Sequence, residues 1–196
     1  VSNDSWQGPN AVKNMALRHC NIFTNGVSGS DRYHNTYIEG DRTVYEFCEY
    51  RLLNGGGAHL KDRSAGAVIR YNRFHSSTRQ VDVVDPESGA AFLKASPNWG
   101  RTYHYGNIHV SDRQSAVIHF VFDGQWQNTQ KDLYSFFNTL THTGPDKITW
   151  HKVNGSPARV FCGNNIYHYG GGMFAVFYQH ETGQGGTYFH VMGNFV

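Results

Sequence analysis

Lys61 and Arg63 are the residues whose types and spacing most directly suggest chemistry. Residues i and i+2 of an extended strand point to the same face, so we expect these two side chains to be neighbours. Elimination next to a carboxylate needs a base and a cation that stabilises the enolate-like charge, and this pair could supply both. The second cation would also lower the pKa of the lysine. The alternative is a solvated basic strand without a chemical role.

Three further side chains are candidates for the same chemistry. His34 and His59 are reserve acids or bases, and Tyr37 is a candidate proton donor. Interior histidines with satisfied hydrogen bonds would explain the same residues without any catalytic role.

The acidic residues Asp82, Asp85 and Glu87 lie close together in the sequence. Carboxylate oxygens are the ligands that calcium prefers, so these three residues form a candidate calcium site. A turn rich in Asp, Pro, Glu, Ser and Gly would explain the same residues without a metal. Both interpretations remain open at this point.

Composition restricts both the fold and the partners. Only 16% of the 196 residues are charged, with 17 basic and 15 acidic side chains, so no strong field favours binding to nucleic acid or to an anionic membrane. The chain has no run of 18 apolar residues that could span a membrane. The 22 glycines and 15% aromatic residues suit short strands and tight turns, so we expect an all-β protein.

A degenerate repeat organises the chain. Each copy is a short alternating segment that ends in Asn, or Glu in one case, followed by an apolar, aromatic or polar residue. The repeated positions are Asn21, Glu49, Asn72, Asn107, Asn138, Asn165 and Asn194. Neighbouring positions are 23 to 35 residues apart, and the alternation is that of strands rather than helices. This pattern predicts a parallel β-solenoid of about seven rungs.

The recurring asparagines have a physical reason in such a stack. Amides stacked at the strand spacing of ~4.8 Å can hydrogen-bond along the stack, and Asn tolerates left-handed turns. We therefore predict an asparagine ladder. Asn that merely marks solvent-exposed turns is the alternative. The longer excursions at 24–43, 75–101 and 109–131 are the places where a solenoid would carry function.

Cysteines and tryptophans add two smaller hypotheses. Cys20 and Cys48 both precede the repeated position in consecutive copies, so a disulfide between stacked residues is possible, with two buried thiols as the alternative. Trp99 and Trp126 lie in or beside loops, where exposed indoles would form platforms for sugar rings. Indoles packed in the interior are the alternative here.

The chain resembles secreted bacterial right-handed parallel β-helix proteins, which include polysaccharide lyases. The resemblance lies in the repeated Asn and in three stretches: Tyr33–Ile38, His59–Arg63 followed by Ile69–Phe74, and Pro97–Arg101. The Lys-x-Arg segment is similar to the region where several such lyases place a base and a charge-neutralising arginine. Asn35 and Arg101 lie in the stretches that carry the resemblance, and we expect them, together with the indoles of Trp99 and Trp126, to contact substrate.

These observations lead to two hypotheses from different classes. In the first, the chain is a secreted or cell-surface β-helix that binds an acidic polysaccharide and, if it is an enzyme, cleaves it by β-elimination. In the second, it is a structural fibre, spike or appendage subunit that stacks end to end as a homo-oligomer or filament. In both, residues 1–196 form one domain, and because the sequence stops inside the seventh copy we expect an uncapped segment of a longer solenoid.

Overall fold

The computed structural model describes residues 12–75, 77–86, 88–113, 115–121, 131–154, 158–170, 175–181 and 187–194. Within these residues the protein is all-β apart from one 3-10 helix, η2 (Ser88–Ala95). The all-β class predicted from composition is therefore correct. No helix of the described part is long and apolar enough to cross a membrane.

The strands form three parallel sheets. The seven-stranded sheet consists of β1 (Lys13–Arg18), β4 (Asp41–Glu46), β7 (Gly66–Arg70), β10 (Arg101–Tyr105), β13 (Lys131–Phe136), β16 (Ala158–Gly163) and β19 (Thr187–Met192). One six-stranded sheet consists of β2 (Asn21–Asn25), β5 (Glu49–Leu53), β8 (Arg73–Phe74), β11 (Ile108–Ser111), β14 (Thr139–His142) and β17 (Ile166–Tyr169). The other consists of β3 (Thr36–Ile38), β6 (Ala58–Asp62), β9 (Arg79–Val83), β12 (Ser115–Val121), β15 (Ile148–Asn154) and β18 (Ala175–Glu181).

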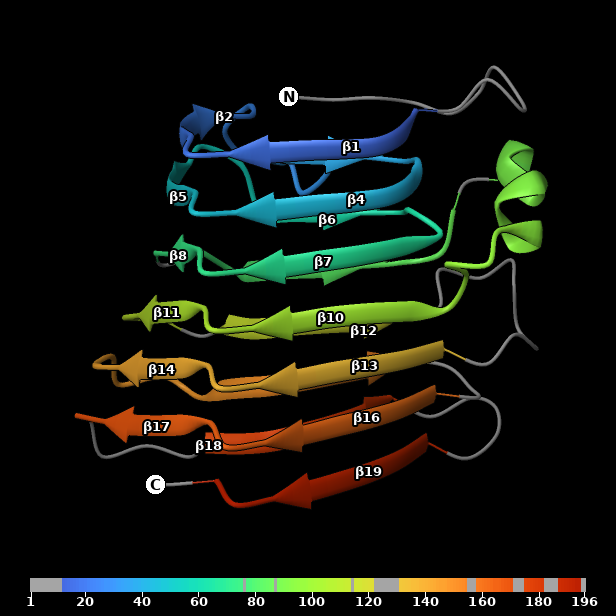
Figure 1. Ribbon diagram of the computed structural model, residues 1–196. Coiled ribbons are helices and arrows are strands. Elements are labelled where there is room, and N and C mark those ends of the chain that lie inside the picture. Colours follow the sequence, from blue (N-terminus) through green and yellow to red (C-terminus); the bar gives the residue numbers. More distant parts are fainter. Residues whose placement is uncertain are drawn as a thin grey trace.

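Every third strand along the chain joins the same sheet, so the chain coils through the three sheets in turn (Figure 1). All of the pairings between these strands are parallel, as in β4 against β7 and β10 against β13. This arrangement is that of a parallel β-solenoid. The helix η2 lies beside the N-terminal ends of β4 and β7, outside the sheets (Figure 1).

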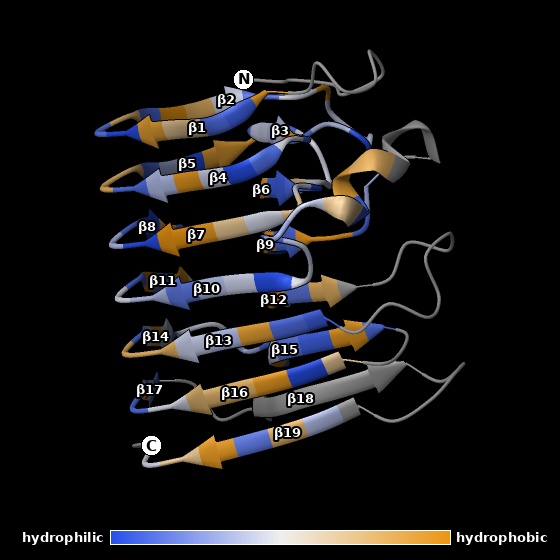
Figure 2. Cartoon of the chain, turned by 45° about the vertical axis from the view of Figure 1, so that its right-hand side comes forward, coloured by the Kyte–Doolittle hydropathy of each residue, from blue (hydrophilic) through white to orange (hydrophobic). Residues whose placement is uncertain are grey.

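The core lies between the three sheets and combines apolar side chains with stacked rings. Tyr50 stacks on Phe74 at a centroid distance of 4.8 Å, and Phe74 stacks on His109 at 5.0 Å. Trp150 is buried in the same cluster. Hydrophobic and hydrophilic residues occur within single strands, as in β13 and β16 (Figure 2), because successive side chains point inward and outward.

Five asparagines, all but the last of them buried, form a column at the turn between the seven-stranded sheet and the sheet of β2. The Nδ2 of each asparagine donates to the Oδ1 of the next one in the column. The distance is 3.1 Å from Asn72 to Asn107 and 3.0 Å for the three later pairs, Asn107 to Asn138, Asn138 to Asn165 and Asn165 to Asn194. Each side-chain oxygen also accepts the backbone N–H of the preceding member, as in Asn72 N to Asn107 Oδ1 at 3.0 Å. The column thus satisfies polar groups inside the turn.

Asn21 and Glu49 do not belong to this column, and the predicted register is wrong by one residue there. The backbone N–H of Cys48 donates to Asn72 Oδ1 at 2.9 Å, so Cys48 occupies the equivalent position. Glu49 instead pairs with Asn21 on one side and Arg73 on the other.

The backbone of the turn explains the correct alignment. A residue with positive φ precedes each column position: His19, Phe47, Tyr71, Gly106, Phe137, Asn164 and Gly193. In the first two turns the left-handed residues are His19 and Phe47. Cys20 and Cys48 therefore stand where the later turns have Asn. Both are free thiols, as is Cys162, so the disulfide alternative is wrong.

Candidate functional site

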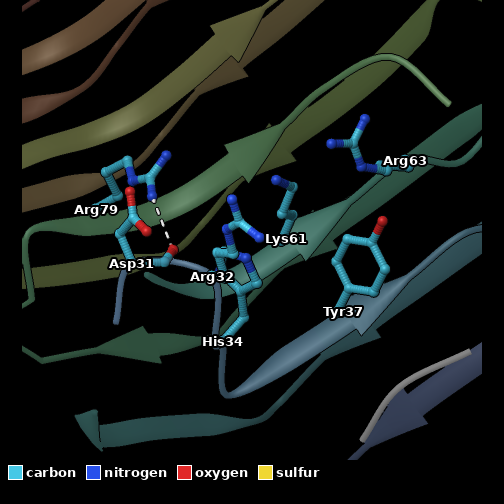
Figure 3. Close-up of a pocket in the computed structure, with 7 residues that line it drawn as sticks. All are labelled: Asp31, Arg32, His34, Tyr37, Lys61, Arg63 and Arg79. Atoms are coloured by element: carbon cyan, nitrogen blue, oxygen red, sulfur yellow. Dashed lines mark hydrogen bonds between the residues drawn. The ribbon is translucent and has the colours of Figure 1, made fainter. Parts of the chain in front are cut away.

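The strongest candidate site is a cavity of about 410 Å³ beside β3, β6 and β9. Its lining residues are mostly polar and charged; they are Asp31, Arg32, His34, Tyr37, Lys61, Arg63 and Arg79. Figure 3 shows Asp31 and Arg79 at one end, Lys61 in the middle and Arg63 at the other end. We call this the Lys61 cavity.

Three parallel strands and two loops position these side chains. Tyr37 of β3 pairs with Lys61 of β6, which brings one aromatic ring and one ammonium group side by side on neighbouring strands. Arg79 begins β9, the next strand of the same sheet. Asp31, Arg32 and His34 come from the 24–43 excursion, which passes over these strands.

Tyr37 lies at the centre of the contacts within the cavity. The Lys61 ammonium lies 5.8 Å and the Arg63 guanidinium 5.9 Å from the centroid of its ring. His34 stacks on the ring at 5.9 Å. These distances are those of cation–π contacts, so the ring holds both cations close together.

Lys61 and Arg63 both line the cavity, as the alternation along a strand predicts, but their environments differ. Lys61 is half-buried, whereas Arg63 is only 6% exposed. The Arg63 guanidinium donates to the backbone carbonyl of Asp85. Arg63 is therefore a fixed charge in the cavity wall, and Lys61 is the more accessible of the two cations.

His34 is a neutral hydrogen-bond donor rather than a base. Burial, together with the charge of Lys61, lowers the pKa of His34 to about 4. Its Nδ1 accepts the backbone N–H of Ala58 at 2.8 Å, so the proton of the neutral ring resides on Nε2. An acidic ligand in the cavity would meet an N–H donor at this position.

Asp82 lies beneath the cavity and compensates part of its charge. It pairs with Lys61 in the strand register, forms an ion pair with Arg79 at 3.3 Å and is hydrogen-bonded to His119 Nδ1 at 2.7 Å. Burial raises the pKa of Asp82, but the hydrogen bond with His119 and the nearby cations outweigh it and hold that pKa below its usual value. Asp82 is therefore an ionised carboxylate that holds cations in place.

This arrangement does not support the calcium interpretation. Asp82 is engaged by Arg79 and His119, and the buried Asp85 forms an ion pair with Lys131, so different cations occupy both carboxylates. No group of three potential metal ligands occurs among the described residues. The third predicted ligand, Glu87, lies outside them.

Two residues predicted for the site lie in the interior. The His59 ring is fully buried, donates to the carbonyl of His75 and accepts from the Asn35 amide at 2.8 Å. Asn35 is also fully buried and accepts the backbone N–H of Asn25. Both side chains tie the 24–43 excursion to the solenoid, so the assignment of His59 to catalysis and of Asn35 to substrate contact is corrected to a structural role.

The remaining predicted residues lie apart from the Lys61 cavity. Trp99 packs on the small apolar cluster of Ala65 and Leu93, and the Lys131 ammonium lies 5.3 Å from its ring, so it is not an exposed platform. Arg101 is exposed on the seven-stranded sheet, where it lines a different hollow. Trp126 lies outside the described residues.

Asp31, Arg32 and Arg79 are cavity residues that the sequence reasoning did not single out. All three fall within or next to the long excursions at 24–43 and 75–101, which were expected to carry function. Their position in these segments is the only signal in the sequence, since the adjacent Asp31 and Arg32 and the separate Arg79 belong to no recognisable motif.

Comparisons of the chain with protein-family models, with curated proteins and with solved structures returned no match. The fold and the cavity therefore define this protein as a parallel β-solenoid with a cation-lined cavity on one of its sheets.

Proposed function

We propose that the chain is a right-handed parallel β-helix domain of about seven rungs that binds an acidic polysaccharide in the Lys61 cavity. The observation that carries this proposal is the lining of the cavity. Four cationic side chains, Arg32, Lys61, Arg63 and Arg79, share it with a single carboxylate, that of Asp31. Such an excess of positive charge at one concave site favours an anionic ligand.

The other lining groups suit a carbohydrate with carboxylates. Tyr37 offers an apolar ring edge between the cations, and the N–H of His34 Nε2 is available to a carboxylate or hydroxyl oxygen. The volume of about 410 Å³ lies within the range of roughly 300–1,000 Å³ that is usual for small-ligand sites. A short segment of a polyuronate fits these requirements.

Cleavage by β-elimination is the enzymatic form of this proposal. The deprotonated form of Lys61 would take the proton from the carbon next to the uronate carboxylate, and Arg63 would stabilise the charge that develops on that carboxylate. The electron pair would form a carbon–carbon double bond as the glycosidic oxygen leaves, and the Tyr37 hydroxyl would protonate that oxygen. His34 does not serve as the base, because its accessible nitrogen carries a proton.

Replacing Lys61 by Ala is expected to weaken polyuronate binding about 10- to 100-fold, the loss of one charge-assisted contact of about 1.5–3 kcal/mol. If the protein is a lyase, the ultraviolet absorbance of an unsaturated product should also disappear. The free energy of unfolding should change by no more than about 0.5 kcal/mol, because Lys61 is a half-buried surface residue. Calorimetric titration and denaturant unfolding measure the two effects.

Lys147→Ala is the matched control, because Lys147 is an exposed lysine away from the cavity. An equal loss of binding in both variants would show that net charge alone is responsible. A wild-type protein that neither binds nor cleaves polygalacturonate, alginate and glycosaminoglycans would overturn the proposal and leave the structural alternative, a subunit that stacks end to end.

A further inference from the structure

A second hollow, of about 240 Å³, lies on the outer face of the seven-stranded sheet, away from the sheet that carries the Lys61 cavity. Its lining residues come from β4, β7, β10 and the turn before β10; they are Arg42, Gly66, Ala67, Val68, Asn98, Arg101 and Tyr103. We call this the Arg101 hollow. Three features of its lining point to a ligand.

The first feature is a pair of arginines without partners. Of the arginines in the seven-stranded sheet, Arg18 and Arg70 are paired with Glu46, and Arg159 is paired with Asp132. Within the described residues, no ion pair or side-chain hydrogen bond engages Arg42 or Arg101. Both are exposed, and both line the same hollow.

The strand register explains why these two guanidinium groups can act together. Gly66 of β7 pairs with Arg101, and the pairing of Thr43 with Ala67 places Arg42 beside Gly66 on the other side. The two arginines are thus two strand spacings apart, roughly 10 Å between backbones, and the glycine between them contributes no side chain. The backbone oxygen and Cβ of Asn98 pack over Gly66, so an anion reached by both long arginine side chains would lie beside Asn98 rather than on the glycine.

Neither of the neighbouring carboxylates, Asp132 and Asp41, forms an ion pair with Arg42 or Arg101 among the described residues. Asp132 follows Arg101 in the register, but Arg159 binds both of its oxygens, at 2.8 and 2.7 Å. Asp41 precedes Arg42, and its Oδ1 accepts from Ser96 at 2.7 Å and from Asn98 at 3.1 Å. These bonds also fix Asn98 above Gly66, at the wall of the hollow.

The second feature is an open aromatic face. Outward side chains of the sheet stack along the solenoid from Tyr103 to Tyr134 at 5.0 Å and from Tyr134 to Phe161 at 5.0 Å. The next position beyond Tyr103 in this row is Val68, which has no ring. Tyr103 therefore ends the stack, and it is 39% exposed beside the hollow that it shares with Val68.

The third feature is backbone strain at Arg42. This residue has a φ of 60°, a left-handed conformation that a non-glycine residue adopts at some energetic cost. Strain of this kind often accompanies functional positions.

From these features we infer that the Arg101 hollow is a second carbohydrate site, which binds one pyranose unit that carries a carboxylate. The carboxylate would lie between Arg42 and Arg101, and the apolar face of the sugar ring would stack on Tyr103. This inference stands on its own observations and does not depend on the Lys61 cavity. Under this inference Arg101 contacts a ligand on the seven-stranded sheet and not in the Lys61 cavity.

Titration of glucuronate into ¹⁵N-labelled protein, followed by amide chemical shifts, tests the inference. Shifts at Gly66 and Tyr103 report the Arg101 hollow, and shifts at Tyr37 and Lys61 report the Lys61 cavity, so the two proposals can fail separately. We expect saturable shifts at the hollow with glucuronate. Glucose, which lacks the charge, and acetate, which lacks the ring, should bind at least 10-fold more weakly there.

Variants identify the groups responsible. Arg42→Gln combined with Arg101→Gln should weaken glucuronate binding at the hollow at least 10-fold, and Tyr103→Ala should weaken it several-fold. Arg18→Gln is the control, because it removes a paired arginine from the same sheet and should leave the affinity within twofold. The inference is overturned if glucuronate shifts no amide of the hollow, if acetate binds as tightly as glucuronate, or if the double variant binds unchanged.

Discussion

Lowering the pH from 7 to 5 is expected to reduce the free energy of unfolding by about 4 kcal/mol through His104 and His109 alone, because both buried rings must stay neutral in the folded protein. His34, whose pKa is also lowered, adds to this loss. Burial lowers the pKa of His104 to about 3. Burial and the neighbouring histidines lower the pKa of His109 well below its usual value. Unfolded histidines titrate near pH 6.5, so below that pH the unfolded chain takes up protons that the folded protein refuses.

The hydrogen bonds around the pair show why neither ring accepts a proton. Gln80 uses its amide nitrogen to donate to the carbonyl of Val110 at 2.9 Å, so its oxygen accepts from His109 Nδ1 at 2.6 Å. His109 Nε2 is then the acceptor for His104 Nε2 at 3.1 Å. Ser135 donates to His104 Nδ1. Each ring nitrogen of the two histidines is thus either a donor or an acceptor. A proton added to His109 Nε2 would face the N–H of His104 Nε2, and two donors cannot share a hydrogen bond.

The direction of the effect follows from these pKa values. Stability is fully present above pH 6.5 and falls as the pH drops from 6.5 toward the folded-state values, at about 1.4 kcal/mol per pH unit for each histidine. A loss of about 4 kcal/mol is a large part of the 5–15 kcal/mol that stabilises an ordinary domain. Urea unfolding at several pH values measures it.

His104→Gln should lower the slope by about 1.4 kcal/mol per pH unit, because it removes one titrating group and keeps an amide that can donate to His109. His168→Gln replaces an exposed histidine and should leave the slope unchanged. A stability that is flat between pH 7 and pH 5 would contradict the neutral pair.

Much of the fold could be predicted because its signals are local and repeated. The alternation of short segments and the recurring Asn pointed to parallel strands stacked in register, and Asn72, Asn107, Asn138, Asn165 and Asn194 do share one hydrogen-bonded column. The error at Asn21 and Glu49 arose because the first two turns have Cys20 and Cys48, not Asn, at the column position, and the residue that resembles the repeat stands one position later.

The candidate site was partly predictable for a related reason. Alternation along β6 placed Lys61 and Arg63 on one wall, and proximity in the sequence placed His34 and Tyr37 near them. Alternation did not predict the burial of His59. The 24–43 excursion covers the His59 ring and supplies Asn35 as its hydrogen-bond partner. Such contacts depend on the path of an irregular loop, which no sequence periodicity describes.

Replacing Asn107 by Ala is expected to reduce the free energy of unfolding by about 3–5 kcal/mol. Asn107 Oδ1 accepts from the backbone N–H of Asn72 at 3.0 Å, and its Nδ2 donates to the carbonyl of Ile69 at 2.9 Å and to Asn138 Oδ1 at 3.0 Å. Asn107 is fully buried, so water cannot replace these bonds without entering the turn. Each buried polar group left without a partner costs about 1–3 kcal/mol.

Asn21→Ala is the matched control for this prediction, and it also tests the corrected register. Asn21 is exposed at the start of β2, outside the column, and its loss should cost no more than about 0.5 kcal/mol. Denaturant midpoints of the two variants at an unchanged m-value give the comparison. Equal destabilisation by the two substitutions would place Asn21 in the column after all. A large effect of Asn107→Ala alone would support the corrected register, in which Cys20 and Cys48 occupy the first two column positions. It would also support the view that the asparagine amides stabilise the later turns of the solenoid.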